Sequence, residues 1–110
     1  RNLTTRVLER NGYKVVVACC AEDALSKWKD NIDRIDFLLT DVIMPGMNGL
    51  ELYKTLKKDR LDLKVLYISG YPEEVIADQG CDIRQIELLD KPFSPVRLIS
   101  RIQDIINEVR

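Results

Sequence analysis

The stretch FLLTDVIMPGMNG, residues 37–49, decides the fold. It begins with a short apolar run that shows no polar alternation, which is typical of a strand buried on both faces of a parallel sheet. The run ends at Asp41, and a loop with one proline, one asparagine and two glycines follows. This order predicts one unit of an open α/β sheet, with Asp41 at the carboxyl edge, where such sheets bind ligands.

Short apolar runs alternate with helix-period stretches over the rest of the chain, and this alternation favours βαβ units around a mainly parallel sheet. Besides the run at 37–40, the pattern predicts strands at 15–18, 65–68 and 86–89. It predicts helices over residues 3–10, 22–29, 49–58, 72–79 and 95–109. In the last helix the expected buried stripe consists of Val96, Ile99, Ile102, Ile106 and Val109.

Composition bounds the class of protein. The 110 residues fit one domain, residues 1–110, and the net charge of -1 leaves no basic footprint for nucleic acid or for an anionic membrane surface. No apolar run approaches the roughly 18 residues of a membrane span. Three cysteines without a CxxC pair, together with the lack of histidine, favour a reducing cytoplasm. The start lacks an initiator methionine and a signal core, which predicts a piece of a longer protein.

Three polar residues follow apolar runs: Asp41, Ser69 and Lys91. Parallel strands end at the same edge of a sheet, and neighbouring strands lie about 4.8 Å apart. If the three strands are adjacent, Ser69 lies one spacing from Asp41 and Lys91 lies two spacings away, about 10 Å, which a lysine side chain can cover. A carboxylate nucleophile with a hydroxyl and an ammonium group suits the formation of an acyl phosphate.

Each of these residues also has a plain structural interpretation. An aspartate after a strand is more often a cap or turn former than a nucleophile, a Ser-Gly pair is usually a turn, and a lone lysine is usually a solvated charge. The combination of the three residues favours the functional interpretation.

The motifs that carry these residues resemble those of a known family. LLTDVIMPGMNG at 38–49 resembles the phosphorylation-site segment of response-regulator receiver domains in two-component signalling. VLYISGY at 65–71 looks like their fourth strand, and DKPF at 90–93 resembles their fifth-strand signature. The resemblance implies a flavodoxin-like, doubly wound parallel sheet of order 2-1-3-4-5 with helices on both faces. The segment at 65–74 is similar to receivers attached to hybrid histidine kinases.

The resemblance also implies roles for individual residues. Asp41 would accept the phosphoryl group, Ser69 would sense it, and Lys91, in a cis Lys91-Pro92 setting, would be its cationic partner. Asp41 and the backbone carbonyl of Ile43 would be ligands of Mg²⁺. The implied partner is a histidine kinase or a histidine phosphotransfer protein, and the implied output face spans 72–79, 86–89 and 95–109. Whether the domain forms a homodimer is left open by the resemblance.

The chain departs from the family pattern in two places. Receivers begin with a strand that ends in a pair of acidic residues that hold Mg²⁺, and this first strand and its acidic pair are absent here. Loss of a central strand would leave a gap of about 10 Å, which residues upstream of Arg1, another chain or a rearrangement would have to fill. Glu22 and Asp23 are better interpreted as first-turn residues of a helix than as substitute ligands. Leu88 stands where receivers often carry Tyr or Phe.

Two functions therefore compete. The first is a phosphoacceptor module that takes a phosphoryl group from a phosphohistidine onto Asp41 and switches an output face. The alternative is an unphosphorylated receiver-like module that binds partner proteins, which loss of the acidic pair favours. An Asp-nucleophile phosphatase lacks the second Asp two residues on, and a nucleotide-binding protein lacks a glycine-rich loop.

Overall fold

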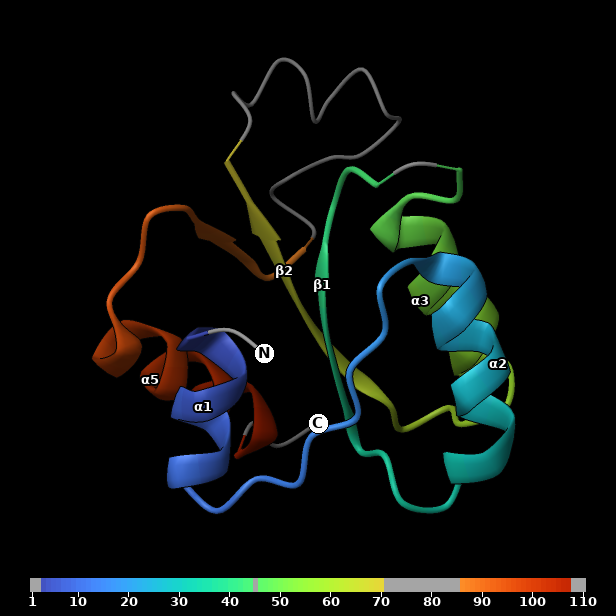
Figure 1. Ribbon diagram of the computed structural model, residues 1–110, viewed down its shortest axis with the longest axis horizontal. Helices are drawn as coiled ribbons and strands as arrows, with labels where there is room; N and C mark the ends of the chain where they lie inside the picture. Colours follow the sequence, from blue (N-terminus) through green and yellow to red (C-terminus); the bar gives the residue numbers. More distant parts are fainter. Residues whose placement is uncertain (1–2, 45, 71–85, 108–110) are drawn as a thin grey trace.

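The computed structural model describes residues 3–44, 46–70 and 86–107. Within them, three parallel strands form one sheet in the order β1-β2-β3, and helices cover both of its faces (Figure 1). This arrangement confirms the predicted doubly wound α/β fold. The elements are α1 (Leu3–Arg10), α2 (Ala21–Asn31), β1 (Phe37–Asp41), α3 (Gly49–Lys57), β2 (Lys64–Ser69), β3 (Leu88–Asp90) and α5 (Pro95–Ile106).

The helices lie in two pairs, α1 with α5 on one side of the sheet and α2 with α3 on the other (Figure 1). On the side covered by α2 and α3, a buried cluster joins both helices to the segment that leads into β2: Ala21, Trp28, Leu52, Leu56 and Leu63. On the side covered by α1 and α5, a buried cluster joins α5 to the sheet: Leu66, Leu89, Leu98, Ile102 and Ile105. Because apolar side chains are buried on both faces of the sheet, the sheet is the middle layer of the fold.

Side-chain hydrogen bonds link α2 to the segment after α3 and link β2 to the end of α5. The indole N–H of Trp28 in α2 donates to Asp59 after α3 (2.9 Å). The ammonium group of Lys64 donates to the carbonyls of Ile105 and Ile106, at 3.1 and 2.8 Å. Both carbonyls belong to the last turn of α5, where that of Ile105 also accepts from the backbone N–H of Asn107. Lys64 therefore links β2 to the end of that helix.

The predicted strand at 15–18 is wrong. Residues 13–18 carry no strand, and β1 has only β2 as a strand partner within the described part of the chain. Val17 offers its carbonyl to the ammonium group of Lys27 rather than to a neighbouring strand. An apolar run becomes a strand only where another strand completes the ladder of hydrogen bonds. The three ways of filling the expected central gap stay predictions.

Two further predictions need correction. Strand β3 covers Leu88–Asp90 rather than 86–89, and the buried face of α5 is formed by Leu98, Ile102 and Ile105. Val96, which was expected in the buried stripe, is 79% exposed. The predicted helix at 72–79 lies outside the described residues. None of the described helices has both the length and the apolar character to cross a membrane.

Candidate functional site

The predicted site lies at the carboxyl edge of the sheet. The strand register pairs Asp41 in β1 with Ile68 in β2, and Ser69 with Asp90 in β3. Lys91 follows Asp90 directly. Because the strand order is β1-β2-β3, the expected adjacency of the three strand ends is confirmed.

Asp41 and Lys91 are in direct contact. The Nζ atom of Lys91 lies 3.0 Å from Oδ1 of Asp41, and the two side chains are 47% and 45% exposed. A half-exposed pair of this kind adds only about 0–1 kcal/mol to folding stability. Both charged groups therefore stay accessible to a ligand while each holds the other in place.

The main chain fixes the approach of Lys91. Its backbone N–H donates to the carbonyl of Ser69 at 2.8 Å, which ties the start of the β3–α5 loop to the end of β2. The Lys91-Pro92 peptide bond is cis, as the resemblance implied. Ser69 itself is buried, so the three predicted residues meet at one edge with different exposures.

Thr40 is a polar residue at this edge that the sequence reasoning missed. It is buried, and its hydroxyl donates to the carbonyl of Asp41 at 3.1 Å. The same hydroxyl lies 3.7 Å from the sulfur of Met44. A threonine within an otherwise apolar run was the available signal, because a buried hydroxyl needs a hydrogen-bond partner.

The loop after Asp41 leads into α3 through a capping box. The Asn48 side chain accepts from the backbone N–H of Glu51 at 2.9 Å, and the Glu51 side chain accepts from the N–H of Asn48 at 3.0 Å. The Asn-x-x-Glu spacing is a recognisable start signal for a helix. Gly46 in the same loop has a φ of 78°, a conformation that suits glycine.

The described residues do not make a complete magnesium site. Mg²⁺ takes oxygen ligands, usually one or two carboxylates together with water and phosphate oxygens. Within residues 3–44, 46–70 and 86–107, no three His, Cys, Asp or Glu side chains cluster closely enough to hold a metal ion. That Asp41 supplies a carboxylate and Ile43 a backbone carbonyl to Mg²⁺ stays a prediction from the resemblance.

Asp23 is engaged elsewhere. Its carboxylate accepts from the backbone N–H of Cys19 at 3.0 Å and pairs with Lys27 at 3.1 Å. These two partners, the Cys19 N–H first, lower the pKa of Asp23 below its ordinary value. Glu22 and Asp23 both lie in the first turn of α2, where carboxylates interact favourably with the helix dipole.

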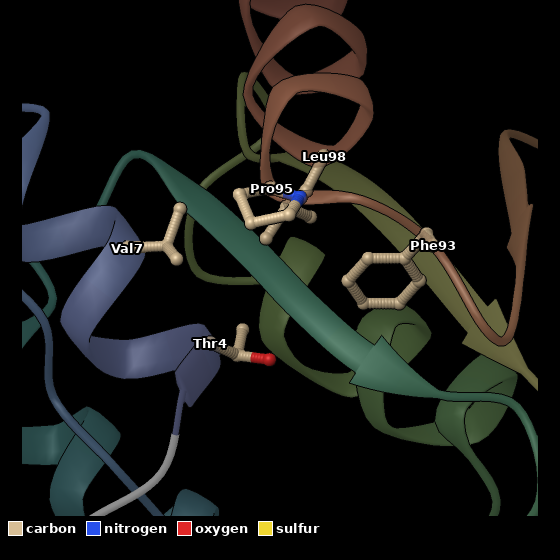
Figure 2. A pocket seen from close by; sticks show the side chains of 5 residues that line it. All are labelled: Thr4, Val7, Phe93, Pro95 and Leu98. Atoms are coloured by element: carbon tan, nitrogen blue, oxygen red, sulfur yellow. The ribbon is translucent and has the colours of Figure 1, made fainter.

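A separate small pocket lies between α1 and the start of α5 (Figure 2). It is lined by Thr4, Val7, Phe93, Pro95 and Leu98. The lining has one hydroxyl, and it lacks the carboxylate and the ammonium group found at the carboxyl edge of the sheet.

The fold and the site together define a class: a doubly wound parallel α/β domain with a carboxylate, a hydroxyl and an ammonium group at its carboxyl edge. The family description "Response regulator receiver domain" matches residues 1–103. The chain therefore belongs to the response-regulator receiver domain family of two-component signalling.

Individual relatives agree with this assignment. The chain is 31% identical to the alkaline phosphatase synthesis transcriptional regulatory protein PhoP of Bacillus subtilis, over 90% of this chain and 40% of that protein. It is 30% identical to the sensor kinase CckA of Brucella abortus, over 94% of this chain and 11% of that kinase. The chain thus spans less than half the length of these relatives.

Solved structures show the same fold. The receiver domain of the hybrid histidine kinase CckA has a TM-score of 0.76 and 31% identity, and the match covers 94% of this chain and 86% of that one. The receiver domain of NtrX from Brucella abortus has a TM-score of 0.78 and 25% identity, with 96% and 88% covered. Receiver domains interact with histidine kinases or phosphotransfer proteins and generally bind Mg²⁺ at an acidic site.

Proposed function

We propose that this domain accepts a phosphoryl group on Asp41 from the phosphohistidine of a histidine kinase or a histidine phosphotransfer protein. The observation that carries the proposal is the contact of Asp41 with Lys91 at 3.0 Å, at the same sheet edge as Ser69. A half-exposed carboxylate can reach a donor, and the ammonium group beside it can neutralise charge on the transferred oxygens.

The proposed step is a displacement at phosphorus. An oxygen of the Asp41 carboxylate attacks the phosphorus, the phosphorus–nitrogen bond of the donor histidine breaks, and the imidazole leaves and takes a proton from solvent. Lys91 then exchanges its contact with the free carboxylate for one with the phosphoryl oxygens. Ser69 donates its hydroxyl to the same group, and the new dianion shifts the output face.

Metal dependence is part of the proposal. Asp41 and the carbonyl of Ile43 would contribute oxygen ligands to Mg²⁺, and the described residues show no cluster of three His, Cys, Asp or Glu side chains that would complete such a site. The labelling reaction therefore should be run with Mg²⁺ and with a chelator.

The test is labelling of the chain by acetyl phosphate and Mg²⁺, followed by mass spectrometry of the intact protein. We expect one phosphoryl group on the wild type and none on Asp41→Asn. Asp90→Asn is the matched control, because Asp90 is an exposed carboxylate at the same edge, opposite Ser69 in the register. Persistent labelling of Asp41→Asn at the wild-type level would contradict the assignment.

A protein-interaction module without phosphorylation is the second candidate. The lack of an acidic cluster among the described residues favours it. It predicts an unlabelled wild type that nevertheless binds its partner, whereas the first candidate predicts labelling that stops when Mg²⁺ is removed.

The kind of protein that carries this domain is also a proposal. The similarity to CckA supports a receiver within a hybrid histidine kinase, and the alternative is a regulator that carries its own output domain, as PhoP is described as a transcriptional regulatory protein. A cytoplasmic location and a possible homodimer belong to the same proposal.

A further inference from the structure

The first residue of α3 is a buried glycine that lies against the backbone of the candidate phosphoacceptor. Gly49 begins the helix, and its backbone N–H donates to the carbonyl of Val42 at 2.8 Å. Val42 in turn donates its N–H to the carbonyl of Ile68 at 3.1 Å. A short chain of hydrogen bonds thus connects the start of α3 with the ends of β1 and β2.

There is no room for a side chain at this position. A Cβ atom on Gly49 would lie 2.1 Å from the carbonyl oxygen of Asp41, 3.1 Å from its carbonyl carbon and 3.2 Å from Cγ2 of Thr40. The first distance is far below any van der Waals contact. Because the two nearest obstructing atoms belong to the main chain of Asp41, a rotamer change cannot relieve the clash.

Neither side of this contact can withdraw freely. The capping box of Asn48 and Glu51 fixes the start of α3, and Leu52 on the same helix is buried in the cluster between α2 and α3. On the other side, the bond from Val42 to Ile68 holds the end of β1 to β2. The displacement caused by a side chain at position 49 would therefore fall on the peptide unit of Asp41, whose carboxylate meets Lys91.

We propose that Gly49 is a positioning residue for the phosphoacceptor: by lacking a side chain, it lets α3 rest on the Asp41 carbonyl and so sets the direction of the carboxylate toward Lys91. The inference rests on the proposed function for its catalytic consequence. The harm expected from a side chain at position 49 is the opposite of what intrinsic helix propensity predicts, because alanine is a better helix former than glycine.

The experiment compares Gly49→Ala with the wild type in two measurements. The first is the rate of labelling by acetyl phosphate and Mg²⁺ at a temperature where circular dichroism shows the variant to be fully folded. We expect this rate to fall about tenfold to a hundredfold, since displacement of a reacting group by about 1 Å has effects of this size. The second is amide hydrogen exchange by NMR, in which residue 49 and Val42 should exchange about tenfold faster.

Two control variants separate positioning from loss of stability. Leu52→Ala removes a buried side chain from the same helix without touching Asp41, so it should lower the melting temperature but keep the labelling rate of the folded protein. Gly70→Ala adds a methyl group near the site, but its Cβ would lie 3.8 Å from Cβ and Cδ of Lys91, an ordinary contact. Its rate should match the wild type.

Wild-type labelling of Gly49→Ala, or unchanged exchange at residue 49, would overturn the inference. A rate loss of equal size in Leu52→Ala would also overturn it, because the effect would then follow from stability. If the wild type is not labelled at all, the proposed function fails by itself. The exchange measurement then still decides whether a side chain at position 49 displaces the Asp41 segment.

Discussion

Two sets of charged side-chain contacts in this domain, those of Lys91 and those of Arg60, lie at opposite edges of the sheet. Lys91 and Asp41 form one half-exposed pair at the carboxyl edge of the sheet. At the opposite edge, the guanidinium group of Arg60 donates to Asp36 and Asp62 and to the carbonyls of Ile32 and Ile35. The first pair is half exposed and, under the proposed function, would exchange its contact for one with the phosphoryl group, whereas Arg60 joins the loop before β1 to the loop before β2.

Loss of the Lys91 ammonium group should therefore leave the fold almost unchanged. We expect Lys91→Met to alter the free energy of unfolding by less than about 1 kcal/mol, because the pair is half exposed and screened by water. Urea unfolding followed by the fluorescence of buried Trp28 measures this change. A loss of several kcal/mol would show that Lys91 has a structural role, and Lys54→Met, on an exposed part of α3, is the matched control.

The Arg60 contacts predict a pH dependence. The hydrogen bond and charge of Arg60 lower the pKa of Asp62 below its ordinary value of about 3.9. A lowered pKa in the folded state gives stability that is present above the ordinary pKa and is lost as the pH falls through the folded one. Melting temperatures of wild type and Asp62→Asn should thus differ at pH 7, and the difference should shrink as the pH falls below the ordinary pKa and through the lowered pKa of the folded state. A constant difference down to pH 2 would contradict this assignment.

At the residue scale, sequence reasoning could find Asp41, Ser69 and Lys91 because each lies one or two residues past the end of a predicted strand, and parallel strands end at one edge. It could not find the contact of Gly49 with the Asp41 carbonyl. That contact depends on how closely α3 approaches β1, which no local pattern encodes. The roles of the three residues stay predictions until labelling is measured.

The helices and strands show where local patterns suffice. The runs that became β1 and β2 were recognisable because they are continuous, apolar and bounded by turns, and α3 was recognisable from its capping signal. In α5 two apolar stripes compete, since the helix carries apolar residues at several overlapping spacings of three and four. Packing against the sheet selected the stripe with Leu98, Ile102 and Ile105, and the sequence alone did not distinguish it.

This choice of stripe can be tested by two truncations in the same helix. Leu98 is 1% exposed, so Leu98→Ala should cost about 2–5 kcal/mol of unfolding free energy. Val96, on the first turn, is 79% exposed, and Val96→Ala should stay within about 0.5 kcal/mol of the wild type. Urea unfolding measures both. Equal costs for the two variants would contradict the observed stripe, and a larger cost for Val96→Ala than for Leu98→Ala would favour the stripe predicted from the sequence.

At the scale of the whole molecule, the sheet is covered on both faces, and among the described strands the outer edges of β1 and β3 have no strand partner. Strand β2 lies between two partners, whereas β1 pairs with β2 alone within the described residues. The doubly wound class was predictable from the alternation of strands and helices. The failure at 15–18 has a tertiary cause, because a strand there requires a neighbour that local pattern cannot supply.

The edge of β1 that has no partner among the described strands predicts an alternating pattern of amide protection along β1. Val42 donates to β2, and the carbonyl of Asp36 accepts from β2. Even-numbered residues of this segment therefore direct their backbone groups toward β2, and Thr40 should be protected while Leu39 faces the open edge. We expect the Leu39 amide to exchange about a hundredfold faster than that of Thr40 in NMR hydrogen exchange.

The central strand provides the control for this pattern. Tyr67 in β2 donates to the carbonyl of Glu87 at 2.9 Å, and Leu66 alternates with it toward β1, so both amides should be protected. Equal protection of Leu39 and Thr40 would contradict an open edge in solution. If that protection increased with protein concentration, a second copy would be pairing with β1, because exposed strand edges are templates for further strands.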